Sequence, residues 1–387
     1  MSINFFKKFL SLVLIGTMLI LLCVPIQAEE TDDSESMSFE CESVILMEAI
    51  TGTVLYESNA DKALPPASVT KIMTLLLVME EIEEGNLKYS DMITTSSYAA
   101  SMGGSQIYLK EGEQMSALDM IKSVIIASAN DATVALAEHI CGSEDAFVRR
   151  MNEKAKELGM YNTNFENTNG LDDTTLKHLT SARDIAIMSR ELIKHDKIVE
   201  FSSTWMDSIR NGEFGLTNTN RLVRFYKGAT GLKTGSTSKA KFCVSATAKR
   251  DNMHLICVVM GAPSSDIRNS IAKRLLDWGF ANYELYEDSS RELTPIKVYS
   301  GTERSCAISA NNYSCVVKKG QAKNIEKRIS MPEYVKAPVE KGQIIGSLEY
   351  YIGDRFLGKT DIVSQINVDK IEFCDLFVRI LSNFLLK

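Results

Sequence analysis

Three short polar motifs lie far apart in this sequence. They constrain the fold because they can act together only where the chain brings them to one place. The motifs are Ser68-Val-Thr-Lys71, Ser128-Ala-Asn130 and Lys233-Thr-Gly235. Together they contain a nucleophile, a base, a proton relay and a cationic group that can bind an anion. A serine acyl-transfer enzyme needs these groups when lysine replaces histidine as the base. Each motif alone is weak evidence, since Ser-x-x-Lys also begins at Ser236, Ser238 and Ser270.

The first motif is predicted to lie where a proline-stiffened loop enters a helix. The apolar residues of 72–82 recur at helical spacing, and Gly85 marks the expected end. Ser68 would then lie at the helix start, where unpaired backbone N–H groups can stabilise an oxyanion. Lys71 can act as a base only if its pKa is lowered, which burial and a second cation such as Lys233 would do. The alternative is that Ser68 is only an N-cap and Lys71 a solvated helix residue.

The second motif is predicted to interrupt two helices. Ser128-Ala-Asn130 follows the capping pattern Ser116-Ala-Leu-Asp119 and the apolar run 120–127. A further helical stretch, 131–141, begins directly after it. A polar triplet at such a break can point into a cleft, although the triplet alone also fits helix capping.

The third motif precedes segments that predict antiparallel strands. Lys233-Thr-Gly235 is followed by the apolar runs 242–248 and 253–260, which are separated by the turn 249–252. A strand with this motif beside a cleft would offer a cation, a hydroxyl and an open backbone to an extended ligand. The alternative is a glycine turn with a surface lysine.

Taken in order, the motifs resemble those of the penicillin-binding proteins and serine β-lactamases. Neighbouring segments narrow the resemblance to the low-molecular-weight serine D-alanyl-D-alanine carboxypeptidases, from about residue 41 to the C-terminus. These segments are Thr51-Gly-Thr-Val-Leu-Tyr56, Leu64-Pro-Pro-Ala67, Ala127-Ser-Ala-Asn-Asp131, Asn169-Gly-Leu-Asp-Asp173 and Gly231-Leu-Lys-Thr-Gly235. The resemblance implies an α/β (α+β) penicillin-binding catalytic domain with an antiparallel sheet flanked by helices. It also implies chemistry without a metal or an organic cofactor.

The resemblance also implies the catalytic roles. Ser68 would be the acylated nucleophile, Lys71 its general base, and Ser128 the relay that passes the proton to the leaving D-alanine. The backbone N–H groups of Ser68 and Ser236 would form the oxyanion hole. Relatives often have histidine or tyrosine in place of Ser236, but a backbone donor survives that difference.

The remaining matched residues are expected to bind the substrate. Asn130 would hold Lys71 and the substrate amide, while Lys233 and Thr234 would bind the terminal carboxylate on the strand that Gly235 keeps open. Relatives usually have glycine in place of Lys241. This lysine therefore raises the question of how a bulky cation near the substrate strand affects the rate.

Composition excludes several other functions. The formal net charge of −7 provides no basic field for nucleic acid. The chain contains no HExxH, CxxC or GxSxG motif, so no metal site and no Ser-His-Asp hydrolase is expected. The four histidines, His139, His178, His195 and His254, are isolated in the sequence. Each is expected to lie on the surface or in the core with its hydrogen bonds made within the protein. An odd number of scattered cysteines does not indicate a disulfide framework, although Cys306 and Cys315 could pair across a hairpin.

The chain divides into five expected segments. Lys7 and Lys8 precede an apolar stretch that ends before Ala28, as in an export signal; an uncleaved anchor is the alternative. Beyond about Ser289, short strand-like runs replace helical periodicity at 294–299, 305–310, 314–318, 325–331, 344–352 and 355–362. The segments are a signal (1–28), a linker (29–40), the catalytic domain (41–287), a small all-β domain (288–368) and an amphipathic anchor helix (369–387).

The last segment has one apolar stripe, formed by Phe373, Leu376, Phe377, Ile380, Leu381, Phe384 and Leu385. Such a stripe at a chain end favours a helix in a membrane interface, and the alternative is a helix docked on the protein. The expected location is therefore extracytoplasmic, at the outer face of the cytoplasmic membrane on the cell-wall side.

The expected function is removal of the terminal D-alanine from peptidoglycan stem pentapeptides, with β-lactams as inhibitors. A D,D-endopeptidase and a β-lactamase share the motifs and remain alternatives, and a catalytically silent wall-binding protein is the alternative from another class. The intact set Ser68, Lys71, Ser128, Asn130 and Lys233 argues against the silent protein.

Overall fold

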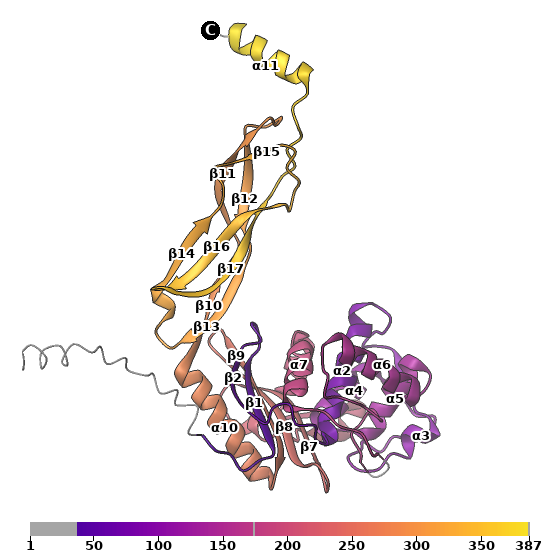
Figure 1. Cartoon of the computed structure of the whole chain (residues 1–387). Helices are drawn as coiled ribbons and strands as arrows, with labels where there is room; N and C mark the ends of the chain where they lie inside the picture. The colour runs from indigo at the N-terminus through magenta and orange to yellow at the C-terminus, as the bar shows by residue number, and fades with distance from the viewer. Residues whose placement is uncertain (1–36, 173–174, 386–387) are drawn as a thin grey trace, which may run out of the picture. The chain divides into compact units, whose positions relative to one another are not determined.

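A five-stranded sheet forms the centre of the first part of the chain in the computed structural model, which describes residues 37–172 and 175–385 (Figure 1). The strand order is β2-β1-β9-β8-β7, and every neighbouring pair is antiparallel. The apolar runs predicted after the third motif are two of these strands. The strands are β1 Ser43–Glu48, β2 Val54–Ser58, β7 Ala229–Thr237, β8 Lys241–Arg250 and β9 Met253–Ala262.

The two faces of this sheet pack against different helices, α7 (Ala182–Leu192) and α10 (Ser265–Asn282). Side chains alternate between the faces along a strand. Ile45 of β1 belongs to the core that also contains the buried residues of α7. Leu46, the next residue, points the other way, and its side chain lies close to Gly279 of α10.

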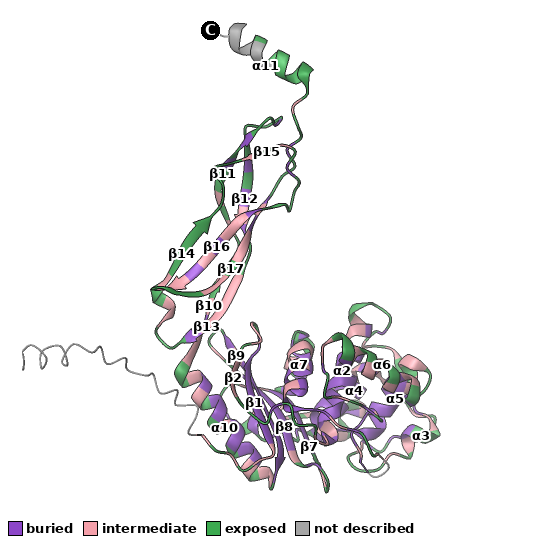
Figure 2. Cartoon of the chain, in the orientation of Figure 1, coloured by how far each residue is buried: buried purple, intermediate pink, exposed green. Residues whose placement is uncertain are grey.

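A helical region shares the α7 side of the sheet and contains the first motif. Its central helix, α2 (Lys71–Glu83), is buried along most of its length (Figure 2). Gly85 follows the helix with φ of 80°, so the predicted end is confirmed. The other helices are α3 Ser97–Ala100, α4 Ala117–Lys122, α5 Asn130–Cys141, α6 Glu144–Glu157, α8 Asp196–Ser202 and α9 Leu222–Phe225. Two short antiparallel pairs are β3 Met92–Thr94 with β4 Gln114–Ser116, and β5 Met206–Ile209 with β6 Phe214–Thr217.

The part after α10 consists of strands with a core of their own. A six-stranded sheet has the order β14-β16-β17-β12-β11-β15, and β10 pairs separately with β13. The predicted strand runs all coincide with strands, whereas β10 and β15 were not predicted. The bounds are β10 Tyr283–Asp288, β11 Arg291–Tyr299, β12 Ser305–Ala310, β13 Tyr313–Lys318, β14 Ile325–Ser330, β15 Tyr334–Lys336, β16 Ile344–Ile352 and β17 Arg355–Ser364.

The first of these strands bears on where the β part begins. The boundary expected between 287 and 288 falls inside β10. Asp288 accepts a hydrogen bond from Tyr350 of β16 over 2.8 Å, and the rings of Tyr350 and Tyr313 stack with centroids 3.9 Å apart. The described cysteines are all free thiols, and Cys306 lies against Ser364 rather than Cys315.

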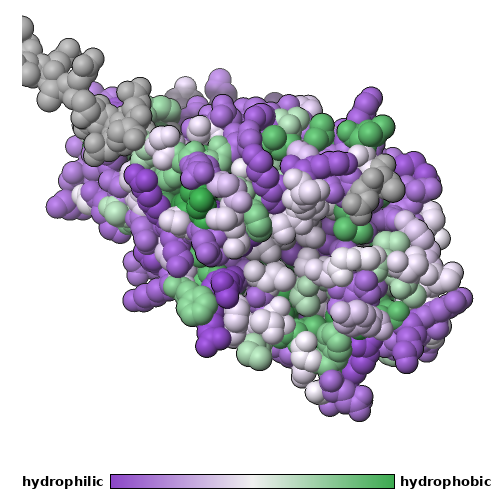
Figure 3. Space-filling view, turned by 90° about the horizontal axis from the view of Figure 1, so that it is seen from below, coloured by the Kyte–Doolittle hydropathy of each residue, from purple (hydrophilic) through white to green (hydrophobic). Residues whose placement is uncertain are grey.

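The chain ends in the helix α11 (Phe373–Leu385), which falls within the segment predicted to be helical. Phe373 is 81% exposed and Phe377 is 57% exposed. By contrast, on the face of the molecule in Figure 3 hydrophilic side chains predominate, and hydrophobic ones form small separate groups. Within the described residues, no helix is long and apolar enough to cross a membrane. The expected export signal, 1–28, lies outside the described residues.

Candidate functional site

The first motif forms the turn that opens α2. Ser68 lies in a 3-10 turn, Ala67–Thr70, which runs directly into the helix. Ala67 has φ of 50°, a left-handed conformation that is uncommon for residues other than glycine. Lys71 Nζ donates to Ser68 Oγ over 2.9 Å and to the carbonyl oxygen of Asn169 over 2.7 Å. The lysine and the serine therefore meet on one helix face, as their spacing predicted.

The electrostatic environment lowers the pKa of Lys71. Its side chain is fully buried, and burial is the main reason that its pKa lies well below the usual value for lysine. The charge of Lys233 lowers the pKa further, while the carboxylate of Asp131 opposes the shift. Burial and the nearby Arg268 lower the pKa of Lys233 to about 7. A neutral Lys71 amine can accept the proton of Ser68, so these residues can provide a serine with its base.

The second motif lies at the helix break that was predicted. Ser128 follows a π-helical turn, Ser123–Ala127, and has left-handed φ of 64°. Asn130 opens α5, and its Nδ2 donates to the carbonyl oxygen of Gly103 over 2.6 Å. Its Oδ1 is buried and has no hydrogen-bond partner in the part of the chain that the structure describes. Because an unpaired buried acceptor costs about 1–3 kcal/mol, this oxygen is well placed to accept an N–H group from a ligand.

The third motif lies on β7, and its glycine lets the strand approach the first motif. A Cβ atom on Gly235 would lie 2.8 Å from the backbone nitrogen of Ser68, closer than real Cβ contacts allow. Lys233 is fully buried, and its Nζ donates to the carbonyl oxygen of Thr234 over 2.9 Å. Thr234 Oγ1 donates to Thr219 Oγ1 over 2.8 Å.

A cavity of about 250 Å³ lies where the three motifs meet. The predicted residues that line it are Ser68, Ser128, Thr234, Gly235 and Ser236. The other predicted residues, Lys71, Asn130 and Lys233, are buried with at most 2% of their surface exposed. The structure therefore brings every predicted site residue to one place, and the wall of the cavity supplies hydroxyl groups and backbone rather than lysine ammonium groups.

Arg268 on α10 also lines this cavity and was not predicted. The residue is 5% exposed, and its Nε and Nη2 donate to Asn269 Oδ1 over 3.1 and 3.0 Å. Among the described residues, no carboxylate lies within ion-pair distance of Arg268, and burial lowers its pKa to about 10. A buried cation without an anion at a cavity wall provides an anion site. No sequence motif surrounds this arginine, so only its position in the fold identifies it.

Asn169 is a second residue whose contact was not predicted. Its carbonyl oxygen accepts the Lys71 hydrogen bond that the resemblance assigned to Asn130. The contact uses the backbone of a loop 98 residues away in sequence. A backbone acceptor at that separation leaves no side-chain signal in the sequence.

The lysine that differs from the usual glycine forms an ion pair and does not line the cavity. Lys241 has φ of 54° at the start of β8, which explains why glycine would fit there easily. Its Nζ forms an ion pair with Glu42 over 3.1 Å, and Glu42 also binds Lys62 over 2.7 Å. Lys241 is not one of the residues that line the cavity.

Comparison with known proteins identifies the family. The family model for D-alanyl-D-alanine carboxypeptidases (Peptidase_S11) matches residues 28–264. The chain belongs to this carboxypeptidase family. The model for the C-terminal domain of penicillin-binding protein 5 matches residues 280–370, which contain the all-β part. The chain is therefore an enzyme of the serine D-alanyl-D-alanine carboxypeptidase type with a penicillin-binding fold, as the resemblance implied.

Individual relatives in the carboxypeptidase family extend over nearly the whole chain. D-alanyl-D-alanine carboxypeptidase DacF of Bacillus subtilis is 41% identical, covering 98% of this chain and 99% of that protein. D-alanyl-D-alanine carboxypeptidase DacC of Escherichia coli is 32% identical, covering 92% of this chain and 91% of that protein. The crystal structure of penicillin-binding protein 5 from Haemophilus influenzae superposes with a TM-score of 0.78 at 32% identity, covering 86% of this chain and 99% of that one.

Proposed function

We propose that Ser68 is the nucleophile of this carboxypeptidase and that Lys71 is its general base. The observation that carries the proposal is the 2.9 Å hydrogen bond between Lys71 Nζ and Ser68 Oγ, made by a lysine whose pKa is lowered by burial. When Ser68 Oγ attacks a carbonyl carbon, its proton passes to the neutral amine of Lys71. The backbone N–H groups of Ser68 and Ser236 stabilise the negative charge that develops on the carbonyl oxygen.

The substrate is a peptidoglycan stem peptide that ends in D-Ala-D-Ala. Attack forms an ester between Ser68 and the penultimate D-alanine, and the bond to the terminal D-alanine breaks. The hydroxyl of Ser128 passes a proton from Lys71 to the leaving amine, and Asn130 Oδ1 accepts a substrate N–H group. Water then hydrolyses the ester, which releases the shortened peptide and restores Ser68.

The terminal carboxylate of the substrate binds at Thr234 and Arg268, which both line the cavity. The resemblance assigned this role to Lys233 and Thr234. Lys233, however, is fully buried and donates to the backbone of Thr234. Its charge therefore acts mainly on the pKa of Lys71, while the arginine supplies the cation that contacts the carboxylate.

The same cavity binds β-lactams, because a β-lactam amide resembles D-Ala-D-Ala and acylates the serine. Rapid deacylation in a β-lactamase usually needs a dedicated carboxylate with a water. None of the described residues that line the cavity is an aspartate or a glutamate. This composition favours a carboxypeptidase that β-lactams inhibit over a β-lactamase that destroys them.

Release of D-alanine from a pentapeptide tests the proposed function. The purified enzyme should release one D-alanine for each pentapeptide ending in D-Ala-D-Ala, and Ser68→Ala should release none. A cross-linked peptide dimer assayed in parallel measures D,D-endopeptidase activity. Faster cleavage of the dimer than of the pentapeptide would favour the endopeptidase, and release by Ser68→Ala would contradict the assigned nucleophile.

The helix α11 attaches the enzyme to a membrane surface, with export directed by the segment 1–28. Thirteen residues of helix extend about 20 Å, whereas the hydrocarbon core of a bilayer is about 30 Å thick. The helix therefore lies in the interface and inserts its exposed apolar side chains, which include Phe373 and Phe377. We infer that the exported enzyme acts at the outer face of the cytoplasmic membrane.

Co-sedimentation with liposomes tests the membrane attachment. Phe377→Glu together with Leu381→Glu should weaken binding by several kcal/mol, given about 1.5–3 kcal/mol for each large apolar side chain buried. Val378→Ser, one residue along the same helix, is the milder control. Release by moderate salt alone, or unchanged sedimentation of the double variant, would contradict a hydrophobic attachment. Penicillin acylation should be the same in all three proteins.

A further inference from the structure

A buried histidine outside the three motifs contacts the turn that contains Ser68. His178 is 4% exposed, and its ring packs beside Phe165 with centroids 5.8 Å apart. Its Nδ1 accepts a hydrogen bond from the backbone N–H of Glu166 over 2.9 Å. Its Nε2 lies 2.8 Å from Thr70 Oγ1, in the first motif. The histidine therefore bridges a loop and the turn of the nucleophile.

The hydrogen bonds around Thr70 fix the direction of every proton in this bridge. The threonine hydroxyl has one proton and donates it to the carbonyl oxygen of Ala67 over 2.8 Å. It must therefore accept from His178 Nε2–H. Because Nδ1 accepts from Glu166, the ring is the neutral tautomer with its proton on Nε2. Burial lowers the pKa of His178 to about 4, with Glu166 and Asp172 opposing this shift and Lys71 adding to it.

The bridge ends on the peptide group that supplies an oxyanion donor. The carbonyl of Ala67 and the N–H of Ser68 belong to the same planar peptide, so the direction of one determines the direction of the other. Ala67, which carries this carbonyl, has φ of 50°, a conformation that costs about 1–2 kcal/mol for a residue with a Cβ atom. Without its hydrogen bond, the peptide could relax toward ordinary backbone and turn the Ser68 N–H away from the cavity.

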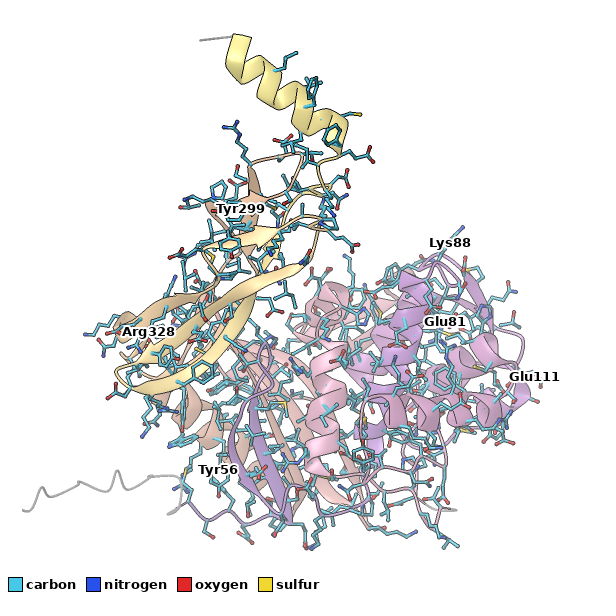
Figure 4. All side chains as sticks on the ribbon, turned by 45° about the horizontal axis from the view of Figure 1, so that its top comes forward. Tyr56, Glu81, Lys88, Glu111, Tyr299 and Arg328 are labelled. Carbon is cyan, nitrogen blue, oxygen red and sulfur yellow. The ribbon has the colours of Figure 1, made fainter. Side chains whose placement is uncertain are left out.

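We propose that His178 is a positioning residue: through Thr70 it holds the Ala67 carbonyl and thereby directs the backbone N–H of Ser68 into the oxyanion hole. The inference rests on the proposed function, because it takes Ser68 as the acylated residue. It is independent of how α2 is held near its other end, which contains Glu81 (Figure 4). Glu81 forms an ion pair there with Arg150 of α6 over 2.5 Å. Loss of the bridge should therefore act locally on the turn.

Two substitutions of His178 separate its two hydrogen bonds. The amide of glutamine reaches the position of Nε2, so His178→Gln keeps a donor for Thr70 and loses the acceptor for Glu166. The shorter amide of asparagine reaches only the position of Nδ1, so His178→Asn keeps the acceptor and loses the donor. A residue that merely anchors the loop would need the Glu166 bond, whereas the positioning role needs the Thr70 bond.

The measurement is the acylation rate with a fluorescent penicillin, resolved into the binding constant and the maximal rate. His178→Asn should lower the maximal rate about 10- to 100-fold, since loss of one oxyanion donor costs about 10²–10³. The binding constant should change little, and His178→Gln should stay within about threefold of the wild type. Equal losses in the two variants, or a larger loss in His178→Gln, would overturn the proposal.

Thr70 provides the same test from the other partner and covers the case in which a histidine variant does not fold. Thr70→Val should show the loss of His178→Asn, and Thr70→Ser should not. The double variant His178→Asn with Thr70→Val should acylate no more slowly than either single variant, because the two substitutions remove the same bridge. Additive losses would overturn the positioning role. An unlabelled Ser68 in the wild type would instead refute the proposed function, so the two failures are distinguishable.

Discussion

Substitution of Gly170 by alanine should disable the turn that contains Ser68, because Gly170 lies directly against this turn. Gly170 has φ of 86°, and a Cβ atom there would lie 1.9 Å from the carbonyl oxygen of Ala67 and 2.8 Å from Thr70 Oγ1. Real Cβ contacts are essentially never shorter than 3.0 Å, so the two backbones must separate by at least 1.1 Å, the difference between 3.0 and 1.9 Å. A displacement of about 1 Å at a reacting group costs about 10²-fold in rate.

The same substitution should also destabilise the fold. The left-handed conformation costs about 1–2 kcal/mol with a Cβ atom, and overpacking adds about 1–3 kcal/mol, so the free energy of unfolding should fall by about 2–5 kcal/mol. Gly85→Ala is the matched control, since Gly85 has φ of 80° and open space around its Cβ position. Gly85→Ala should lower the free energy of unfolding only by the conformational contribution of about 1–2 kcal/mol, and it should acylate at the wild-type rate.

Stopped-flow acylation and urea unfolding measure the two effects on the same preparations. Gly170→Ala should acylate about 100-fold more slowly than the wild type under conditions where it remains folded. A folded Gly170→Ala variant that acylates within about threefold of the wild type would refute the argument that this close contact holds the turn.

Three further predictions concern the charges of the site. Lys71→Arg should abolish acylation, because a guanidinium cannot deprotonate and act as a base, and a near-normal rate measured by penicillin labelling would contradict the base role. The pH profile of acylation should fall on the acid side as Lys71 becomes protonated. Lys233→Met removes a cation that lowers the pKa of Lys71 and should move this limb to higher pH, whereas Asp131→Asn removes the opposing charge and should move it to lower pH. Shifts in the same direction would contradict the electrostatic account. Arg268→Ala should raise KM about 10- to 100-fold for a pentapeptide with a free carboxylate, since hydrogen bonds to charged groups contribute about 1.5–3 kcal/mol, and should change it little for the C-terminal amide. An equal rise in KM for both peptides would exclude Arg268 as the carboxylate contact.

Local patterns in the sequence were sufficient to predict α2, α5, the strands that follow the third motif and most strands of the C-terminal part, but not β1, β2, α7 and α10, which complete and flank the central sheet. The helical spacing after Ser68 predicts α2, and Gly85 predicts its end, because apolar periodicity and a left-handed glycine are local properties. The apolar runs after Gly235, separated by the turn 249–252, likewise predict β8 and β9. The strands β10 and β15 were not predicted, since β10 follows α10 without a break and β15 has only three residues, Tyr334–Lys336.

The candidate site was predictable only where its residues form motifs. Ser68, Lys71 and Ser128 lie in short segments whose residue types and spacing indicate their chemistry. Arg268 and His178 are single residues that tertiary packing brings to the site, and the Lys71 contact of Asn169 uses only its backbone carbonyl. No local pattern distinguishes such residues from ordinary ones, so their positions became apparent only in the folded chain.

The central claim is that Ser68 carries the acyl group. Its most direct test is mass spectrometry of the intact protein and of its proteolytic peptides after brief reaction with a penicillin. One penicilloyl group should be found per chain, on the peptide that contains Ser68, and Ser68→Ala should carry none. A label on Ser236, Ser238 or Ser270, or a label that persists in Ser68→Ala, would contradict the account.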